Sequence, residues 1–484
     1  MNDTNRSWHR HRWLRVITGR QRFSSPRSAV WALGMLGLGS AVVAGLVSGC
    51  RGVPADGERE AQAAVAEVGE RLARTEAGGR GGEDLTADSG LDDYLAAAMR
   101  GQPRVRAAYF AWAATVDRIT VERSLPDPLL TFQMDLREVV QAVMPGLMMD
   151  FPGPGKLGAR AAVVEAESRA RYFGFQQAVL AAAFDVKQAY FRLRFLEDRL
   201  RLTRENLALV GELEQIARAQ NAAGRVTLQD VLRAQIEEDR IGTEVANLAD
   251  SRNPLLAALK AAVGLGPADL DLALPTRFDD SASPRSPAEV RSIALARSPR
   301  LRAMTAELNQ AEAGIQLART TRVPDFTTGI EADVYGSPYL YRPRAGVTLP
   351  LWRDKIAAEI RAAQNRKEAT AARLSAAEID LAVEFADRYY AYREAVRNLG
   401  LFEDQLIPKA LQSVAVARAG YLAGQIDFFN LIDAQRTLLD FQLRAVDARL
   451  QLELASAALS LLVAGIPPDG APLLPESDRQ TPDA

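Results

Sequence analysis

The chain has 484 residues, of which 48% are hydrophobic and 25% are charged, and its formal net charge is -2. This is the composition of a folded protein with enough apolar residues to form a core. The nearly neutral charge gives no indication of a nucleic-acid partner. The single cysteine, Cys50, excludes an internal disulfide framework.

Residues 1–49 have the layout of a secretory signal peptide, with an arginine-rich start, an apolar run over 29–47 and small residues ahead of Cys50. The sequence Val47-Ser48-Gly49-Cys50 resembles the lipobox of bacterial lipoproteins, in which the cysteine is lipidated and becomes the first residue of the mature chain. The alternative is a transmembrane anchor, because the apolar run approaches the roughly 20 residues that span a bilayer.

The histidines, His9 and His11, both lie in this N-terminal segment. Cleavage ahead of Cys50 removes them, and lipidation consumes the thiol. Histidine catalysis, zinc sites and cysteine nucleophiles are therefore excluded from the mature chain. We expect no metal site and no cofactor.

An internal repeat organises the rest of the chain. Residues 222–235 (AAGRVTLQDVLRAQ) return as residues 422–435 (LAGQIDFFNLIDAQ). The identical positions are Ala223/Ala423, Gly224/Gly424, Ala234/Ala434 and Gln235/Gln435. Further pairs are Pro103-Arg104 with Pro299-Arg300, and Pro126-Asp127 with Pro324-Asp325. The repeat predicts a duplicated chain, with a first half over 91–277, a linker over 278–287 and a second half over 288–466. Residues 50–90 are interpreted as an N-terminal linker with one short helix near 58–73, and residues 467–484 as a polar tail.

Long helices are predicted in both halves. Apolar residues recur every 3.5 positions from Val231 to Ala262, with exceptions at Glu238 and Arg252, and throughout from Leu431 to Leu462. This period predicts supercoiled helix packing. Helical patterns also cover about 157–219 and about 353–419, and sixty residues of helix span about 90 Å. Kinks are expected at Asn253-Pro254 and Ile407-Pro408.

The repeated stretches predict two tight turns, each of which restarts a helix. Gly224 and Gly424 supply the turns. Thr227 with Asp230, and Asp427 with Asn430, have the spacing of an N-cap residue and the third helical residue.

Each Pro-Asp pair is followed by two runs in which apolar and polar residues alternate. These runs cover 130–136, 142–151, 326–335 and 339–351. Strands of about ten residues with one apolar side are typical of a transmembrane β-barrel. Tyr335, Tyr339 and Tyr341 at one end, with Phe151 and Trp352 at the other, fit aromatic girdles. Four strands cannot close a barrel, so several chains would share one. The alternative is a pair of soluble hairpins packed on the helices.

Together, the lipobox, the duplicated halves, the Pro-Asp-strand hairpins and the glycine turns resemble the TolC-type outer-membrane efflux proteins, over roughly residues 91–466. The resemblance implies a mainly α fold with a small β part, in which duplicated long-helix hairpins form a periplasmic α-barrel. Each chain contributes four strands to a shared 12-stranded transmembrane β-barrel. It also implies a homotrimer in the outer membrane, lipid-anchored and extending into the periplasm, which engages a periplasmic adaptor (membrane-fusion) protein and a proton-driven inner-membrane pump.

The resemblance also assigns residues at the hairpin tips. The pore constriction is implied at Tyr421, Asp433, Asp230 and Asn430, where Asn430 replaces the family's usual Asp. Ile426 stands where some members have an Arg. Helix capping or simple solvation explains Asp230 and Asp433 equally well. Adaptor contacts are implied at the turns, namely Gly224, Arg225, Thr227, Gly424, Gln425 and Asp427.

The function implied is a passive exit duct for substrates that an inner-membrane pump drives out. The first alternative is a structural periplasmic coiled-coil lipoprotein. The second is a lipid-anchored hydrolase, which without histidine would need a carboxylate pair or a Ser-Lys pair at suitable spacing, and the sequence shows no such motif. We therefore expect a protein that is not an enzyme.

Overall fold

The computed structural model describes residues 56–76, 85–136, 140–266, 275, 296–335 and 338–464. Its elements, in chain order, are α2 (Asp56–Glu76), α3 (Leu91–Gly101), α4 (Pro103–Arg123), β1 (Leu129–Leu136), β2 (Val140–Phe151), α5 (Lys156–Ala222), α6 (Leu228–Asp250), α7 (Arg252–Val263), α9 (Pro299–Thr320), β3 (Phe326–Asp333), β4 (Leu340–Val347), α10 (Arg353–Gly400), η1 (Leu401–Leu406), α11 (Ile407–Leu422) and α12 (Phe428–Ala464). The predicted mainly helical fold with a small β part is confirmed. The predicted signal peptide, Cys50, the predicted 278–287 linker and the predicted 467–484 tail lie outside the described residues.

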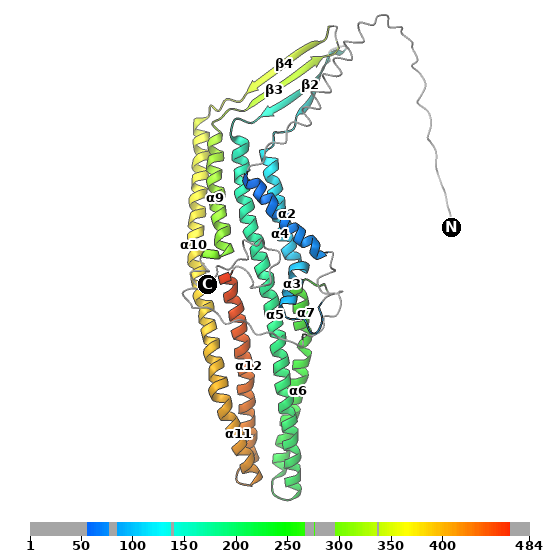
Figure 1. Cartoon of the computed structure of the whole chain (residues 1–484), viewed down its shortest axis with the longest axis vertical. Helices are drawn as coiled ribbons and strands as arrows, with labels where there is room; N and C mark the ends of the chain where they lie inside the picture. Colours follow the sequence, from blue (N-terminus) through cyan, green and yellow to red (C-terminus); the bar gives the residue numbers. More distant parts are fainter. Residues whose placement is uncertain are drawn as a thin grey trace, which may run out of the picture. The chain divides into compact units, whose positions relative to one another are not determined.

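Helix α5 is the element on which the others pack. It is 67 residues long, which corresponds to about 100 Å at 1.5 Å per residue. Helices α4, α6, α7, α9 and α12 all pack against it (Figure 1). Because α5 begins after β2 and ends at the first glycine turn, the sheet and that turn lie at opposite ends of one helix.

Proline residues lie at three breaks between helices, two of which the sequence predicts as kinks. Pro103 begins α4 immediately after α3 ends, because a proline at the first helical position loses no intrahelical hydrogen bond. In the second half, the six-residue π-helix η1 precedes Pro408 and separates α10 from α11. In the first half, the break falls at Ser251, just ahead of Asn253-Pro254.

The largest hydrophobic core lies where α2, α3, α4, α5 and α7 meet. Its fully buried aromatic side chains are Tyr94, Phe175, Tyr190, Phe191 and Phe195, and Trp112 stacks on Phe175 with ring centroids 5.9 Å apart. Helix α2 is longer than predicted and packs into this core through Val68 and Leu72. Glu58 of α2 is completely buried and pairs with Arg123 Nε of α4 at 2.6 Å. The N-terminal linker therefore contains a packed helix.

The four strands form one antiparallel sheet in the order β1-β2-β3-β4. Residue pairs are Leu129–Met148 between β1 and β2, Leu147–Ile330 between β2 and β3, and Glu331–Arg342 between β3 and β4. A register shift follows Asp135. Strand β2 carries Pro145 although it pairs on both sides, which explains why its sequence signal is weaker.

None of the helices among the described residues combines the length and the apolar composition that crossing a membrane would require.

Candidate functional site

One face of the sheet is apolar and exposed. Because side chains alternate between the faces of a strand, residues paired across the sheet share a face. The exposed large apolar side chains of this face come from all four strands, namely Leu130, Phe132, Met134, Leu147, Phe326, Ile330, Tyr341 and Val347. Most of them are about half exposed or more, with Leu130 at 77% and Val347 at 51%. Such a continuous apolar row indicates contact with lipid or another protein.

The opposite face carries paired charges. Glu331 of β3 is buried, and its carboxylate lies 2.7 Å from Arg344 Nη2. Arg342 lies 3.9 Å from Asp333 and donates to Met144 Sδ at 3.1 Å. The alternation predicted from the sequence thus separates charged from apolar side chains in the folded sheet.

A contact between the two halves fixes the sheet to the helices. Asp325, which precedes β3, accepts hydrogen bonds from the Gly153 backbone N–H and from Lys156 Nζ, both at 2.7 Å. The hydrogen bond from Lys156 is the main reason why the pKa of Asp325 is lowered. Lys156 is the first residue of α5. Asp325, from the Pro-Asp pair of the second half, therefore contacts the start of the longest helix of the first half.

The two glycine turns have the same backbone conformation. Gly224 and Gly424 both have φ 72°, in the left-handed region that favours glycine. Arg225 N donates to Gln220 O at 2.9 Å, and Gln425 N donates to Gly420 O at 2.8 Å. The predicted adaptor-contact residues, Gly224, Arg225, Thr227, Gly424, Gln425 and Asp427, are all exposed at these turns.

The structure brings two of the predicted constriction residues close together. Tyr421 is buried in a cluster with Leu213, Val231 and Phe428, and its ring centroid lies 5.4 Å from that of Phe428. Burial, and secondarily the charge of Asp230, raises the pKa of Tyr421. The Tyr421 hydroxyl is buried and has no hydrogen-bond partner among the described residues.

Asp230 forms the predicted helix cap. Its carboxylate accepts hydrogen bonds from Thr227 N at 3.3 Å and Thr227 Oγ1 at 3.1 Å. Asn430 and Asp433 lie in the first turns of α12 with exposed side chains. The single chain thus groups Tyr421 with Asp230, while Asn430 and Asp433 are exposed to solvent.

Above the turns, a polar network joins the two halves. Glu237 of α6 is buried and accepts hydrogen bonds from Arg240 at 2.7 Å and from Arg436 of α12 at 2.5 Å. Gln435 Nε2 donates to Asn206 Oδ1 of α5 at 3.0 Å. This network was not predicted from the sequence, although the repeated Gln235/Gln435 pair was a signal for it. Gln235 contacts Glu214 within its own half, whereas Gln435 reaches across to the other half.

Comparison with known proteins identifies part of the chain. Residues 290–465 match a model described as outer membrane efflux protein. This segment therefore resembles the outer membrane efflux protein family. No curated protein sequence matches the chain.

Solved structures of outer-membrane channels share the fold of this chain. The outer-membrane channel OprN is 18% identical, with a TM-score of 0.67 over 78% of this chain and 90% of its own. VceC from Vibrio cholerae is 16% identical, with a TM-score of 0.64 over 77% and 95%. The open-state MtrE channel from Neisseria gonorrhoeae is 19% identical, with a TM-score of 0.67 over 81% and 91%. The resemblance to TolC-type proteins indicated by the sequence is confirmed.

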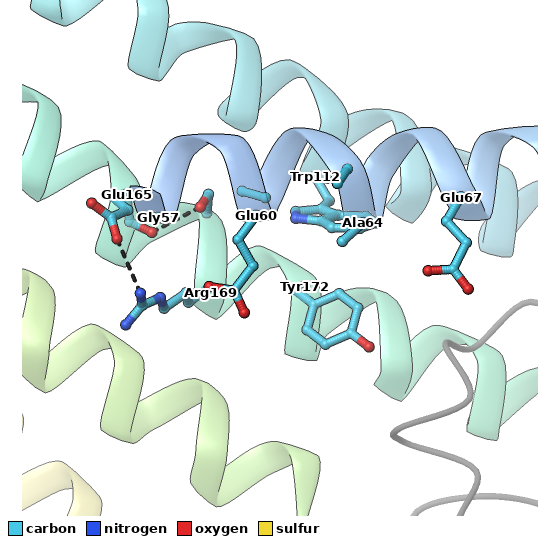
Figure 2. A pocket seen from close by; sticks show the side chains of 11 residues that line it. Gly57, Glu60, Ala64, Glu67, Trp112, Glu165, Arg169 and Tyr172 are labelled. Atoms are coloured by element: carbon cyan, nitrogen blue, oxygen red, sulfur yellow. Dashed lines mark hydrogen bonds and ion pairs between the residues drawn. The ribbon is translucent and has the colours of Figure 1, made fainter. Parts of the chain in front are cut away.

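The chain also has a cleft of about 480 Å³ between α2, α4 and α5 (Figure 2). Trp112 and Tyr172 form an aromatic wall, with ring centroids 4.9 Å apart. Glu60 and Glu67 lie along α2, and Arg169 pairs with Glu165 at 3.0 Å. The cleft exists because α2 packs on the helices, which the sequence did not predict. Among the described residues, no group of three or more His, Cys, Asp or Glu side chains is arranged to hold a metal ion.

Proposed function

We propose that the protein is the outer-membrane channel of a tripartite efflux system. The observation that carries the proposal is the sheet, which has an exposed apolar face, a charged face and two strands, β1 and β4, at its edges. Backbone groups at an open edge have no partner in lipid. Closure with further copies removes the edges, and three copies with four strands each give 12 strands. A coiled-coil scaffold would leave the exposed apolar row unexplained.

The helices continue the proposed channel into the periplasm. Helix α5 is about 100 Å long and leads from the sheet to a glycine turn. In the proposed homotrimer, these helices enclose a duct through which substrates leave passively. The inner-membrane pump, driven by protons, supplies the energy, and a periplasmic adaptor connects the pump to the turns at Gly224 and Gly424. The protein itself catalyses no reaction.

The turns are the proposed gate of the duct. Symmetry around one axis repeats Tyr421, Asp230, Asn430 and Asp433 in every copy. The exposed side chains of Arg225, Thr227, Gln425 and Asp427 form the proposed adaptor contact. The exposed carboxylate of Asp433 faces the axis in this arrangement and attracts cations. The domain limits at 91–277 and 288–466 and the lipid anchor at Cys50 are part of the same proposal.

The proposal is tested with the full-length protein purified in detergent. We expect a mass of three chains by light scattering and discrete ionic conductance after addition to a planar lipid bilayer. In cells, deletion should increase sensitivity to exported compounds, and the wild-type gene should restore resistance. A well-folded single-chain species without conductance would overturn the proposal.

A further inference from the structure

The two hairpins of the chain have the same internal register. Adding 198 to both members of the pair Leu129–Met148 in the first hairpin gives Thr327–Gly346, which is a pair in the second hairpin. The same shift converts Gln133–Met144 into Glu331–Arg342. The two hairpins are therefore equivalent residue by residue, which the sequence repeat alone did not establish.

Between the hairpins, β2 pairs with β3 in one register. Phe151 is opposite Phe326, and Met148 is opposite Gly329. The backbone N–H of Val334 donates to Val143 O at 2.9 Å, which extends the same register further along the strands. We call this junction the inner seam. The outer strands β1 and β4 are the equivalents of β3 and β2, but within one chain they have no strand on their outer sides.

We propose that β4 of one copy pairs antiparallel with β1 of the next copy, in the register that the inner seam dictates. This outer seam rests on the proposed ring of copies and specifies its interface. In this register, each β2 residue of the inner seam is replaced by its equivalent in β4, 198 positions later in the chain. Each β3 residue is replaced by its equivalent in β1, 198 positions earlier. Met148–Gly329 then becomes Gly346 opposite Thr131 of the next copy, and Val347 lies opposite Leu130.

The faces of the sheet agree with this register. Val347, Ala345 and Pro343 lie opposite Leu130, Phe132 and Met134 of the next copy, so the apolar row continues around the ring. Arg344 lies opposite Gln133 on the charged face. A shift of one residue would place every apolar side chain against a polar one. The continuity of the faces thus excludes odd shifts of the register, and the inner seam selects one register among the even ones.

The outer seam also gives a partner to a free carboxylate. Asp135 is exposed and has no hydrogen-bond or ion-pair partner among the described residues. The register places it opposite Arg342 of the preceding copy. Arg342 is half exposed and lies 3.9 Å from Asp333, the equivalent of Asp135 in the second hairpin. In the ring, the Arg342 guanidinium thus lies between two carboxylates, one from each copy.

Cysteine cross-linking tests the register. Pairs alternate along an antiparallel ladder, so the Val334–Val143 hydrogen bond makes Met148–Gly329 a non-hydrogen-bonded pair. The equivalent outer-seam pair, Gly346 and Thr131, then has Cα atoms about 4.5 Å apart, within disulfide range. A Cβ at Gly346 meets only the Thr327 Cβ at 3.7 Å, so a cysteine fits there.

The test variant is Gly346→Cys with Thr131→Cys, in the full-length membrane protein after mild oxidation. The matched control is Gly346→Cys with Gln133→Cys, which lies on the same face but two residues out of register, at a diagonal spacing of about 7–8 Å. Each single variant controls for Cys50. We expect a reductant-sensitive ladder of linked chains on denaturing gels for the first pair and little for the control.

Charge exchange tests the ion pair. Asp135→Arg and Arg342→Asp should each lower the temperature at which the assembly dissociates in detergent, and the two changes together should restore much of the loss. Asp127→Arg, another exposed carboxylate near the start of β1, should have little effect.

The outcomes separate the seam from the function. Preferential linking of the control pair, or an assembled conducting protein that links through neither pair, overturns the seam and leaves the channel intact. A lack of restoration by the double charge variant overturns the ion pair. A folded single chain without conductance overturns the channel proposal itself.

Discussion

Arg436 of α12 donates a hydrogen bond to the buried carboxylate of Glu237 of α6 at 2.5 Å, and this contact joins the two helix pairs that end at Gly424 and Gly224. Burial alone raises the pKa of Glu237, but hydrogen bonds from Arg240 and Arg436 outweigh it and hold the pKa at about 2. The carboxylate therefore stays ionised in the folded protein when free glutamate would take up a proton.

Glu237→Gln should destabilise the tips by about 2 kcal/mol at neutral pH, because charged hydrogen bonds to a buried group are lost. Since the folded pKa is below the ordinary value of 4.5, the stabilisation is fully present above pH 4.5 and is lost as the pH falls towards about 2. Hydrogen exchange of the α6 and α12 amides, followed between pH 6 and 3, measures this loss of stabilisation. Glu238→Gln, one residue away, should leave exchange unchanged. Equal exchange in both variants would contradict the role of Glu237.

Gly424→Ala should destabilise the second tip by about 1 kcal/mol, because its φ of 72° is unfavourable for any residue with a Cβ. No atom lies within 4 Å of the added Cβ, so the loss is due to backbone strain alone. Gly242→Ala in α6 also meets open space but has a helical backbone, and it should stabilise by roughly 0.5–1 kcal/mol. Thermal unfolding followed by circular dichroism compares the two. The same sign of change in both variants would refute this account.

Val347→Lys should lower the stability of the assembled channel by about 2–4 kcal/mol if the residue lies at mid-bilayer, since a cation then faces lipid. Val347 is on the exposed apolar face. Gly346→Lys places the same charge one residue away on the charged face and should be tolerated. Unfolding from lipid vesicles by urea gives the difference, and equal effects at the two positions would reverse the assignment of the faces.

Asp433→Ala should reduce the cation selectivity of the closed channel, because the exposed carboxylates of Asp433 repeat around the proposed axis. Asn430 contributes no charge, so the selectivity of the wild type should itself be modest. Reversal potentials in planar bilayers under a salt gradient measure it. An unchanged reversal potential would make Asp433 an ordinary solvated helix residue.

Cys50→Ser should prevent lipidation, because the thiol that carries the lipid is replaced by a hydroxyl. We expect unprocessed precursor that takes up no labelled palmitate, while the folded body is retained. Metabolic labelling followed by gel analysis measures both effects. Normal processing and labelling of the variant would rule out the lipobox.

Periodicity in the sequence was sufficient to predict the long helices, the strands and the turns, because each depends on neighbouring residues. Alternation over 326–335 corresponds to β3, and the glycine repeat corresponds to two turns of equal geometry. The apolar series that is predicted to begin at Val231 is largely buried in the structure, since Val231, Ala234 and Ile241 are all buried. At one of its two exceptions, Arg252 pairs with Glu197 of α5 at 2.6 Å.

What the sequence did not predict depends on contacts between distant segments. In the sequence, Glu237 lies beside the apolar series, at a position typical of a surface residue. In the folded chain, α12 places Arg436 against it. Glu58 resembles the other acidic residues of the linker, yet Arg123 makes it part of the core. The partners in these pairs are 199 and 65 positions apart, and no local pattern identifies them.

The inner seam has a consequence for assembly kinetics. Three strand pairings form within each chain, so their rates do not depend on protein concentration. Among the strand pairings, only the outer seam requires an encounter between chains, and its rate rises with the surface density of the protein in the membrane. At low expression, four-stranded single chains should therefore accumulate with β1 and β4 exposed, where periplasmic proteases and chaperones reach them first. The abundance of finished channels should rise more steeply than the amount of chain synthesised.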